Sequence, residues 1–287
     1  MSARTWRTGA AIATSTATVA AVGLLSSPAN AAPTWAPADT ATIHPGVQMY
    51  TEGAQCTANF VYTDGSGAVY VGYAAHCAGT GGATDTNGCD AGSLPLGTKV
   101  DFVEGGSLAG PGEVVGTGTL AYSSWLSMQD AGETDENACA YNDLALVKVD
   151  AASLDQVNPS VPFWGGPVAL NTDESAQGED VYSFGNSSLR GGVEELSPKQ
   201  GVSLGAQGEG WSHPVYTFTP GVPGDSGSAF LDAEGNALGT LSTLAIAPLA
   251  GSNGVGDLER ELGYAQQHSG LAGLALAPGT EPFSPLL

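Results

Sequence analysis

Short strand-like runs separated by turn residues fill most of this sequence and constrain its fold more than any other feature. Runs rich in Val, Tyr, Phe and Leu are bounded by Gly, Pro, Asp and Asn, and the chain holds 42 glycines and 17 prolines among 287 residues. Many short strands with turn signals between them predict an all-β sandwich or barrels. The predicted strands are 59–63, 69–73, 99–103, 113–122, 144–149, 180–184, 215–219, 228–231 and 237–244.

One stretch near the end of the chain, residues 256–268, predicts a helix instead. Leu258 and Leu262 lie four residues apart, and acidic residues occur early, where the helix dipole favours them. We expect this C-terminal helix to close a β domain. The glycine-rich segment 253–256 and the Ala-, Gly- and Pro-rich tail after Gly270 are expected to be mobile.

The first 31 residues have the features of a signal peptide. Two arginines give a positive start, residues 10–25 are apolar or small, and residues 29–31, Ala-Asn-Ala, fit the small-x-small cleavage pattern. We therefore expect cleavage after Ala31 and a secreted, extracellular protein that does not stay in a membrane. Residues 32–45 are then an N-terminal extension or a short propeptide, and residues 46–287 form the functional domain.

The charge of the chain excludes two classes of partner. It has 29 acidic residues against 7 Lys and Arg, a formal net charge of -22 at pH 7. A protein that binds nucleic acid needs clustered Lys and Arg to replace the counterions of the phosphates, and this chain has almost none to spare. We therefore expect neither nucleic acid nor an anionic membrane surface as a partner.

The cysteines are even in number and all follow the predicted signal peptide. In an exported chain this predicts disulfides, and three connectivities are open at this point. No C-x-x-C or H-x-x-x-H spacing accompanies them, so a zinc site is the weaker interpretation. No metal and no cofactor is expected. The four are Cys56, Cys77, Cys89 and Cys139.

Three motifs carry candidate chemistry. Tyr-Ala-Ala-His-Cys places His76 at the end of a strand-like run, Asn-Asp-Leu-Ala-Leu-Val places Asp143 at the start of another, and Gly-Val-Pro-Gly-Asp-Ser-Gly-Ser places Ser226 in a glycine-rich turn. Each alone has an ordinary structural explanation, as a half-buried histidine, a strand-entry aspartate or a loop serine. Together they supply a base, a carboxylate that can orient an imidazole, and an exposed hydroxyl beside converging backbone N–H groups.

In that order along the chain, Ala-Ala-His-Cys, Asp-Leu-Ala-Leu and Gly-Asp-Ser-Gly resemble the active-site motifs of the chymotrypsin-like (trypsin-fold) serine proteases. The match looks like the secreted bacterial branch of that family and covers residues 56–244. It implies two packed six-stranded antiparallel barrels, with His76 and Asp143 from the first and Ser226 from the second. Ser226 is then the nucleophile, His76 the general base and later the acid, and Asp143 the carboxylate that orients the histidine.

The same resemblance implies further roles. The backbone N–H groups of Gly224 and Ser226 would form the oxyanion hole. Ser242 matches a family serine that hydrogen-bonds the triad aspartate and lines the substrate cleft. The implied disulfides are Cys56–Cys77, the family's bond beside the histidine, and with it Cys89–Cys139.

The chain departs from the family in the activation of the nucleophile turn. No Arg or Lys precedes an Ile-Val-Gly-Gly-like sequence, so a new N-terminus that pairs with Asp225 is not supported. Asp225 then needs another cation. Arg190 lies where some bacterial members supply one internally, and we hypothesise that it pairs with Asp225.

The residues around the expected specificity pocket favour a neutral substrate side chain. Pro220 stands six residues before Ser226, where trypsin-type members carry an acidic residue, so cleavage after Lys or Arg is disfavoured. Leu241 stands where relatives specific for glutamate use a histidine, and His213 is expected in a surface loop. We expect a neutral, apolar or small side chain before the scissile bond, with Pro220 and Ser242 in contact with substrate.

Two functions from different classes follow. The first is a secreted, monomeric serine endopeptidase that hydrolyses peptides or proteins through an acyl-enzyme. The alternative is a non-catalytic protease-like domain that binds peptide or protein in the same cleft. The intact triad with both oxyanion positions favours the enzyme, because a binding module has no chemical need for all of these groups together.

Overall fold

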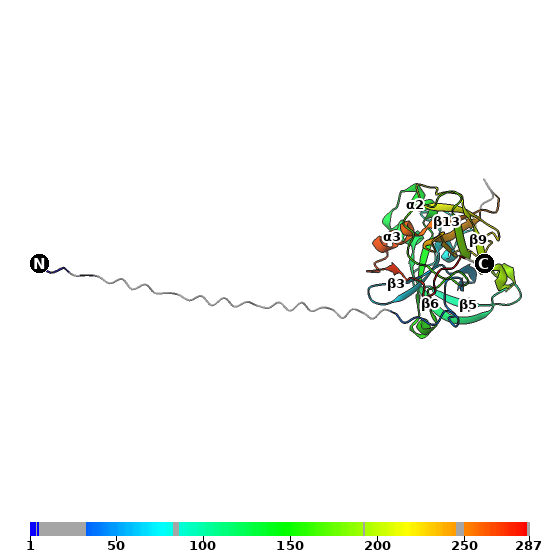
Figure 1. Cartoon of the computed structure of the whole chain (residues 1–287), viewed down its shortest axis with the longest axis horizontal. Helices are drawn as coiled ribbons and strands as arrows, with labels where there is room; N and C mark the ends of the chain where they lie inside the picture. The colour runs from blue at the N-terminus through cyan, green and yellow to red at the C-terminus, as the bar shows by residue number, and fades with distance from the viewer. Residues whose placement is uncertain (4, 6–32, 83–85, 192, 245–249, 286–287) are drawn as a thin grey trace. The chain divides into compact units, whose positions relative to one another are not determined.

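A computed structural model describes residues 1–3, 5, 33–82, 86–191, 193–244 and 250–285 of the chain (Figure 1). The predicted signal peptide lies outside the described residues except for residues 1–3 and 5, and so does the cleavage site after Ala31. Within the described ranges, no helix combines the length and the apolar character that crossing a membrane requires.

The first part of the chain, together with the C-terminal strand β14, forms an antiparallel sheet of eight strands in the order β14-β3-β4-β7-β6-β5-β1-β2 (Figure 1). Its strands are β1 Gln48–Thr51, β2 Ala54–Thr57, β3 Val61–Thr63, β4 Val69–Ala74, β5 Lys99–Glu104, β6 Glu113–Ser123, β7 Leu144–Val149 and β14 Ala275–Leu276. Between β2 and β3, the Asn59 N–H donates to Gly72 O and the Gly72 N–H donates to Phe60 O, which continues the pairing with β4 across the break. The sheet therefore curves round on itself, because β2 at one end of the strand order and β3 near the other end belong to the same segment, residues 54–63.

This sheet has eight strands where the resemblance implies six. Residues 54–63 count as two strands because they are interrupted at 58–60, and the short β14 from the C-terminal tail adds one more beside β3. The barrel-like course of the remaining strands agrees with the expectation.

The second part forms a closed antiparallel barrel in the order β10-β13-β12-β11-β8-β9. Its six strands are β8 Asp180–Phe184, β9 Pro198–Ser203, β10 Ser212–Thr217, β11 Ala229–Leu231, β12 Ala237–Leu244 and β13 Asn253–Asp257. Alternate residues point inward, as the period of two in a strand requires. The interior is filled by Val181, Val215, Phe230, Leu238, Leu241 and Val255. The predicted all-β, two-barrel architecture is thus confirmed.

Strand β4 shows how the two barrels are packed together. All six of its residues are buried, so both of its faces are covered. Val71 and Tyr73 belong to the core of the first sheet, whereas Tyr70 belongs to a cluster that also contains Trp164 and Leu231 from the second half of the chain. A shared apolar interface therefore fixes the ends of the first-barrel strands against the second barrel.

The described part of the chain contains three α-helices, and one of them was predicted. α3 spans Leu258–His268 and begins two residues after the predicted start, because the Asp257 side chain accepts a hydrogen bond from the Arg260 N–H at 2.8 Å and caps the helix there. α1 Ser124–Ala131 and α2 Glu136–Tyr141 were not predicted. Short 3-10 turns are η1 Ala75–Ala78, η2 Ala151–Gln156, η3 Ser188–Arg190 and η4 Glu194–Leu196.

Two segments that were expected to be mobile are packed instead. Residues 253–256 lie in β13, where a Cβ on Gly254 would come within 2.4 Å of Thr243 Oγ1 on β12. Glycine is needed here for close packing, not for flexibility. In the tail after Gly270, Leu274 and Ala277 are buried, and the Ala277 N–H donates to Val61 O at 2.9 Å.

Candidate active site

His76 and Asp143 are brought together by the pairing of β4 with β7. Ala74 at the end of β4 faces Leu144 at the start of β7, so the residues just beyond these two positions lie side by side. His76 Nδ1 is 2.6 Å from Asp143 Oδ2, and the His76 N–H donates to Asp143 Oδ1 at 2.8 Å. The carboxylate therefore binds both the ring and the backbone of the histidine. This fixes the orientation of the ring, with Nε2 on the side away from Asp143.

Each predicted disulfide anchors one partner of this pair. Cys56–Cys77 ties β2 to η1, which contains His76, with the Cα atoms 6.2 Å apart. Cys89–Cys139 ties α2, which ends two residues before Asp143, to the segment around residue 89, with the Cα atoms 5.2 Å apart. Both pairs implied by the resemblance are present.

The surroundings of His76 favour its protonated form more than bulk water would. Burial lowers the pKa of His76, but the nearby Asp143 carboxylate and its hydrogen bond outweigh burial, so the pKa lies above its ordinary value.

The Ser242 hydroxyl donates to Asp143 Oδ2 at 2.5 Å, as the resemblance implies. Asp143 is therefore a buried carboxylate with three donors directed at it.

Ser226 lies in a tight turn between β10 and β11 that packs against the first sheet. Gly227 has φ +90°, and a Cβ there would come within 2.4 Å of Thr57 O and 2.9 Å of Ala74 N. Glycine is therefore required by both the backbone conformation and the close approach. The Thr57 N–H also donates to Ser226 O at 2.8 Å, so β2 holds the turn directly.

His76 and Ser226 line one cleft of about 650 Å³, together with Gly224 and Ser242. Among the described hydrogen bonds, the N–H groups of Gly224 and Ser226 donate to no protein acceptor, whereas the neighbouring Asp225 N–H donates to Val222 O at 2.8 Å. Two unused backbone donors therefore lie in the turn that carries the serine hydroxyl. Such a pair can stabilise a negatively charged oxygen.

The walls of the cleft are neutral. Apart from His76, none of the described residues that line it carries a charged side chain. Pro220 is not among these residues; its carbonyl oxygen accepts a hydrogen bond from Arg190 Nη2 at 3.1 Å. Asn253 forms part of the wall instead, where its Oδ1 accepts from the Gly221 N–H at 2.7 Å.

Asp225 is fully buried and has two cationic partners. Arg190 Nη2 lies 2.6 Å from Asp225 Oδ2, which is the pairing that we hypothesised, and Lys199 Nζ lies 3.1 Å from the same oxygen. The lysine, on β9, was missed. Burial lowers the pKa of Lys199 to about 8; attraction to Asp225 opposes this shift and repulsion from Arg190 adds to it.

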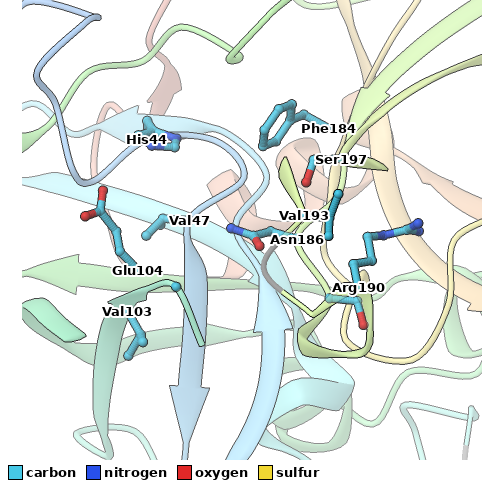
Figure 2. A pocket seen from close by; sticks show the side chains of 11 residues that line it. His44, Val47, Val103, Glu104, Phe184, Asn186, Arg190, Val193 and Ser197 are labelled. Carbon is cyan, nitrogen blue, oxygen red and sulfur yellow. The ribbon is translucent and has the colours of Figure 1, made fainter. Parts of the chain in front are cut away.

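Arg190 also borders a second, smaller pocket of about 320 Å³. Figure 2 shows that its guanidinium points away from His44 and Glu104 on the opposite wall of that pocket. The charged end of Arg190 is thus directed at Asp225 and Pro220 O, not at this pocket.

Glu261, which was not predicted, is a buried acidic residue next to Asp143. It is fully buried on α3, and its Oε1 accepts a hydrogen bond from the Asp143 N–H at 2.9 Å. Burial, together with the charge of Asp143, raises the pKa of Glu261 well above its ordinary value against the opposing effect of that hydrogen bond. A signal was available, because Leu258, Glu261, Leu262 and Ala265 share one helix face and the other three are apolar and buried.

His213 was expected in a surface loop, and this is wrong. It lies in β10 with no exposed surface, because strand alternation turns it into the protein. Its Nε2 is 2.7 Å from Asp257 Oδ2, and its Nδ1 is 2.8 Å from Ser175 Oγ. The histidine therefore supports Asp257, the residue that caps α3.

Solved structures with a similar fold include Thermobifida fusca Protease A, with 18% identity, a TM-score of 0.49 and coverage of 83% of this chain and 99% of that one. The Nocardiopsis protease NAPase is 18% identical with a TM-score of 0.47 and coverage of 82% and 98%, respectively. The Cellulomonas bogoriensis chymotrypsin is 19% identical with a TM-score of 0.47 and the same coverage. These similar structures are bacterial serine proteases. No family model matches the sequence, and no curated protein matches it either.

Proposed function

We propose that this chain is a secreted, monomeric serine endopeptidase with Ser226 as nucleophile, His76 as general base and acid, and Asp143 as the orienting carboxylate. The proposal rests on one observation: His76 and Ser226 line the same cleft, and Asp143 contacts the Nδ1 atom of His76. The turn that contains Ser226 also offers two N–H groups that donate to no acceptor among the described hydrogen bonds. The two disulfides suit an oxidising environment and therefore support secretion.

The proposed reaction uses each of these groups in turn. Ser226 Oγ attacks the carbonyl carbon of the scissile bond while its proton passes to His76 Nε2, and the carbonyl oxygen gains the negative charge. The N–H groups of Gly224 and Ser226 bind that oxygen. His76 then gives the proton to the leaving amine, the C–N bond breaks, and an ester remains on Ser226.

Water repeats the sequence on the ester. Its oxygen attacks the acyl carbon as one proton passes to His76 Nε2, and the proton then goes to Ser226 Oγ as the C–O bond breaks. The products are a carboxylic acid and the free enzyme. Throughout, Asp143 stabilises the imidazolium form of His76 and holds Nε2 toward the serine.

We propose that the residue before the scissile bond has a neutral, apolar or small side chain. Support comes from Leu241 and Val222 in the wall and from the absence of a charged side chain, other than His76, among the described lining residues. A carboxylate in the pocket would be needed to hold Lys or Arg, and a cation or histidine to hold Glu. We expect a peptide library to be cleaved after neutral residues, and a profile dominated by Arg or Glu would refute this specificity.

The pH dependence of hydrolysis tests the role of His76. Below its pKa, Nε2 carries a proton and cannot accept one from Ser226, so kcat/KM should rise with pH through the pKa of the histidine. Because Asp143 raises this pKa, the midpoint should lie above about 6.5. The measurement is kcat/KM for a peptide with a neutral residue before the scissile bond from about pH 5 to 9, with tryptophan fluorescence as a control for folding. A flat profile in a folded protein would contradict the assignment.

A further inference from the structure

A short segment after β8 holds the turn that carries Ser226 from behind. The Ser187 hydroxyl donates to Pro223 O at 2.6 Å, and the Ser187 N–H donates to Asp225 Oδ1 at 3.0 Å. Three residues later, Arg190 reaches the other oxygen of the Asp225 carboxylate. The contacts of Arg190 balance a charge, whereas the Ser187 hydroxyl binds a single backbone carbonyl.

That carbonyl belongs to the peptide that ends in the Gly224 N–H. The Pro223–Gly224 peptide is trans, and in a trans peptide the C=O and the N–H point in opposite directions. With Pro223 O directed at Ser187, the Gly224 N–H must point away from Ser187. It has no protein acceptor among the described hydrogen bonds, and Gly224 lines the cleft.

The orientation of this peptide needs a selecting contact. Gly224 has φ +96° and no Cβ, so its backbone can rotate and turn the Pro223 carbonyl toward the cleft in place of the N–H. The next carbonyl along, Gly224 O, is held from β2 by Thr57 Oγ1 at 2.7 Å and Gln55 Nε2 at 3.0 Å. In the described part of the chain, only Ser187 donates a hydrogen bond to Pro223 O.

The hydroxyl of Ser187 is arranged to act as a donor. Ser187 is 2% exposed, so water does not compete for the bond. Its Oγ accepts from the Leu189 N–H at 3.1 Å, which leaves its single proton for Pro223 O. A carbonyl turned into the cleft would lose this bond and leave a buried hydroxyl without an acceptor.

We infer that Ser187 is a positioning residue that keeps the Gly224 N–H directed at the oxyanion of the reaction. The inference rests on the proposed function, because it assigns a role within that same site. Loss of the hydroxyl lets the Pro223–Gly224 peptide rotate and removes one oxyanion donor part of the time. Since this donor acts on charge that develops in the transition state, kcat falls and KM does not.

The test compares Ser187→Ala with Ser183→Ala in the full chain. Ser183 is a fully buried serine on β8 whose hydroxyl has no hydrogen-bond partner among the described residues, so its variant controls for removing a buried hydroxyl. We expect Ser187→Ala to lower kcat by about 10- to 100-fold, with KM within about twofold, because loss of an oxyanion donor costs up to about 10²–10³ in kcat. Inhibition by a peptide aldehyde, which needs the same donor, should weaken in parallel.

A second pair of variants keeps the test decisive if Ser187→Ala folds poorly. Ser187→Thr keeps the hydroxyl, and Ser187→Val has nearly the shape of the Thr variant without the hydroxyl. We therefore expect kcat to be at least about tenfold higher for the Thr variant than for the Val variant. Equal kcat values for Ser187→Ala and Ser183→Ala, or for the Thr and Val variants, would overturn the inference while the wild type remains active. An inactive wild type would instead refute the proposed function.

Discussion

Arg190→Ala is expected to destabilise the protein and to inactivate it. Among the described residues, the change leaves Lys199, 3.1 Å away, as the one cationic partner of the fully buried Asp225 carboxylate, and it removes the hydrogen bond to Pro220 O. Removing one partner of a buried ion pair lowers the free energy of unfolding by about 3–5 kcal/mol. Because Lys199 remains, we expect a loss of about 3 kcal/mol. Because Asp225 lies between Gly224 and Ser226, we also expect kcat/KM to fall at least about 100-fold. Urea unfolding and steady-state kinetics measure the two effects.

Arg260→Ala is the matched control for this experiment. Arg260 is 40% exposed and its Nη2 lies 3.9 Å from Glu174, so its removal should cost only about 0–1 kcal/mol and leave activity unchanged. If Arg190→Ala unfolds at the same urea concentration as Arg260→Ala and keeps wild-type activity, the Asp225–Arg190 contact has no role in the fold or in the site.

Asp143→Asn should lower kcat about 10⁴-fold without unfolding the protein. One carboxylate oxygen accepts the His76 backbone N–H, so an asparagine keeps its carbonyl there and turns its NH₂ toward His76 Nδ1 and the Ser242 hydroxyl. The NH₂ group donates to Nδ1 and forces the proton of the neutral imidazole onto Nε2. His76 then has no free lone pair with which to take the proton of Ser226.

The control for this variant is Asp101→Asn, the same substitution on β5. Asp101 forms an ion pair with Lys99 at 2.7 Å, with 66% of the lysine side chain exposed, and it does not line the cleft. We expect activity within about twofold of the wild type, because an exposed pair contributes little. The measurement is steady-state kcat of both variants and of the wild type, at pH values above and below the pKa of His76. An Asp143→Asn protein with more than a tenth of wild-type kcat would mean that the aspartate does not set the histidine tautomer.

The strand pattern predicted most of the fold because burial acts on alternate residues. The runs at 144–149, 180–184 and 237–244 agree with β7, β8 and β12 at both ends. Strand β13 was missed because three of its five residues are Gly or Asp, types that usually mark turns. Glycine at 256 is explained by a tertiary contact that a local pattern does not contain, because a Cβ there would come within 2.4 Å of Glu261 Oε1.

The three motifs singled out residues that the structure brings together. His76 contacts Asp143 and lines one cleft with Ser226 and Ser242, and Arg190 pairs with Asp225. Lys199 and the partners of His213 were not found, because no motif surrounds any of them, and Glu261 was overlooked although it shares a face of α3 with apolar residues. Their roles depend on which distant elements pack against them, and one sequence does not specify that packing.

The proposed function requires Ser226 to be an activated nucleophile. To test this, the purified protein, lacking the predicted signal peptide and any uncut propeptide, is incubated with a fluorophosphonate probe and its intact mass is measured. The Ser226→Ala variant is the control. We predict one added phosphonyl group on the wild type and none on the variant. A folded wild-type protein that takes up no label would contradict the enzyme assignment and favour a protease-like domain that only binds peptides in the cleft.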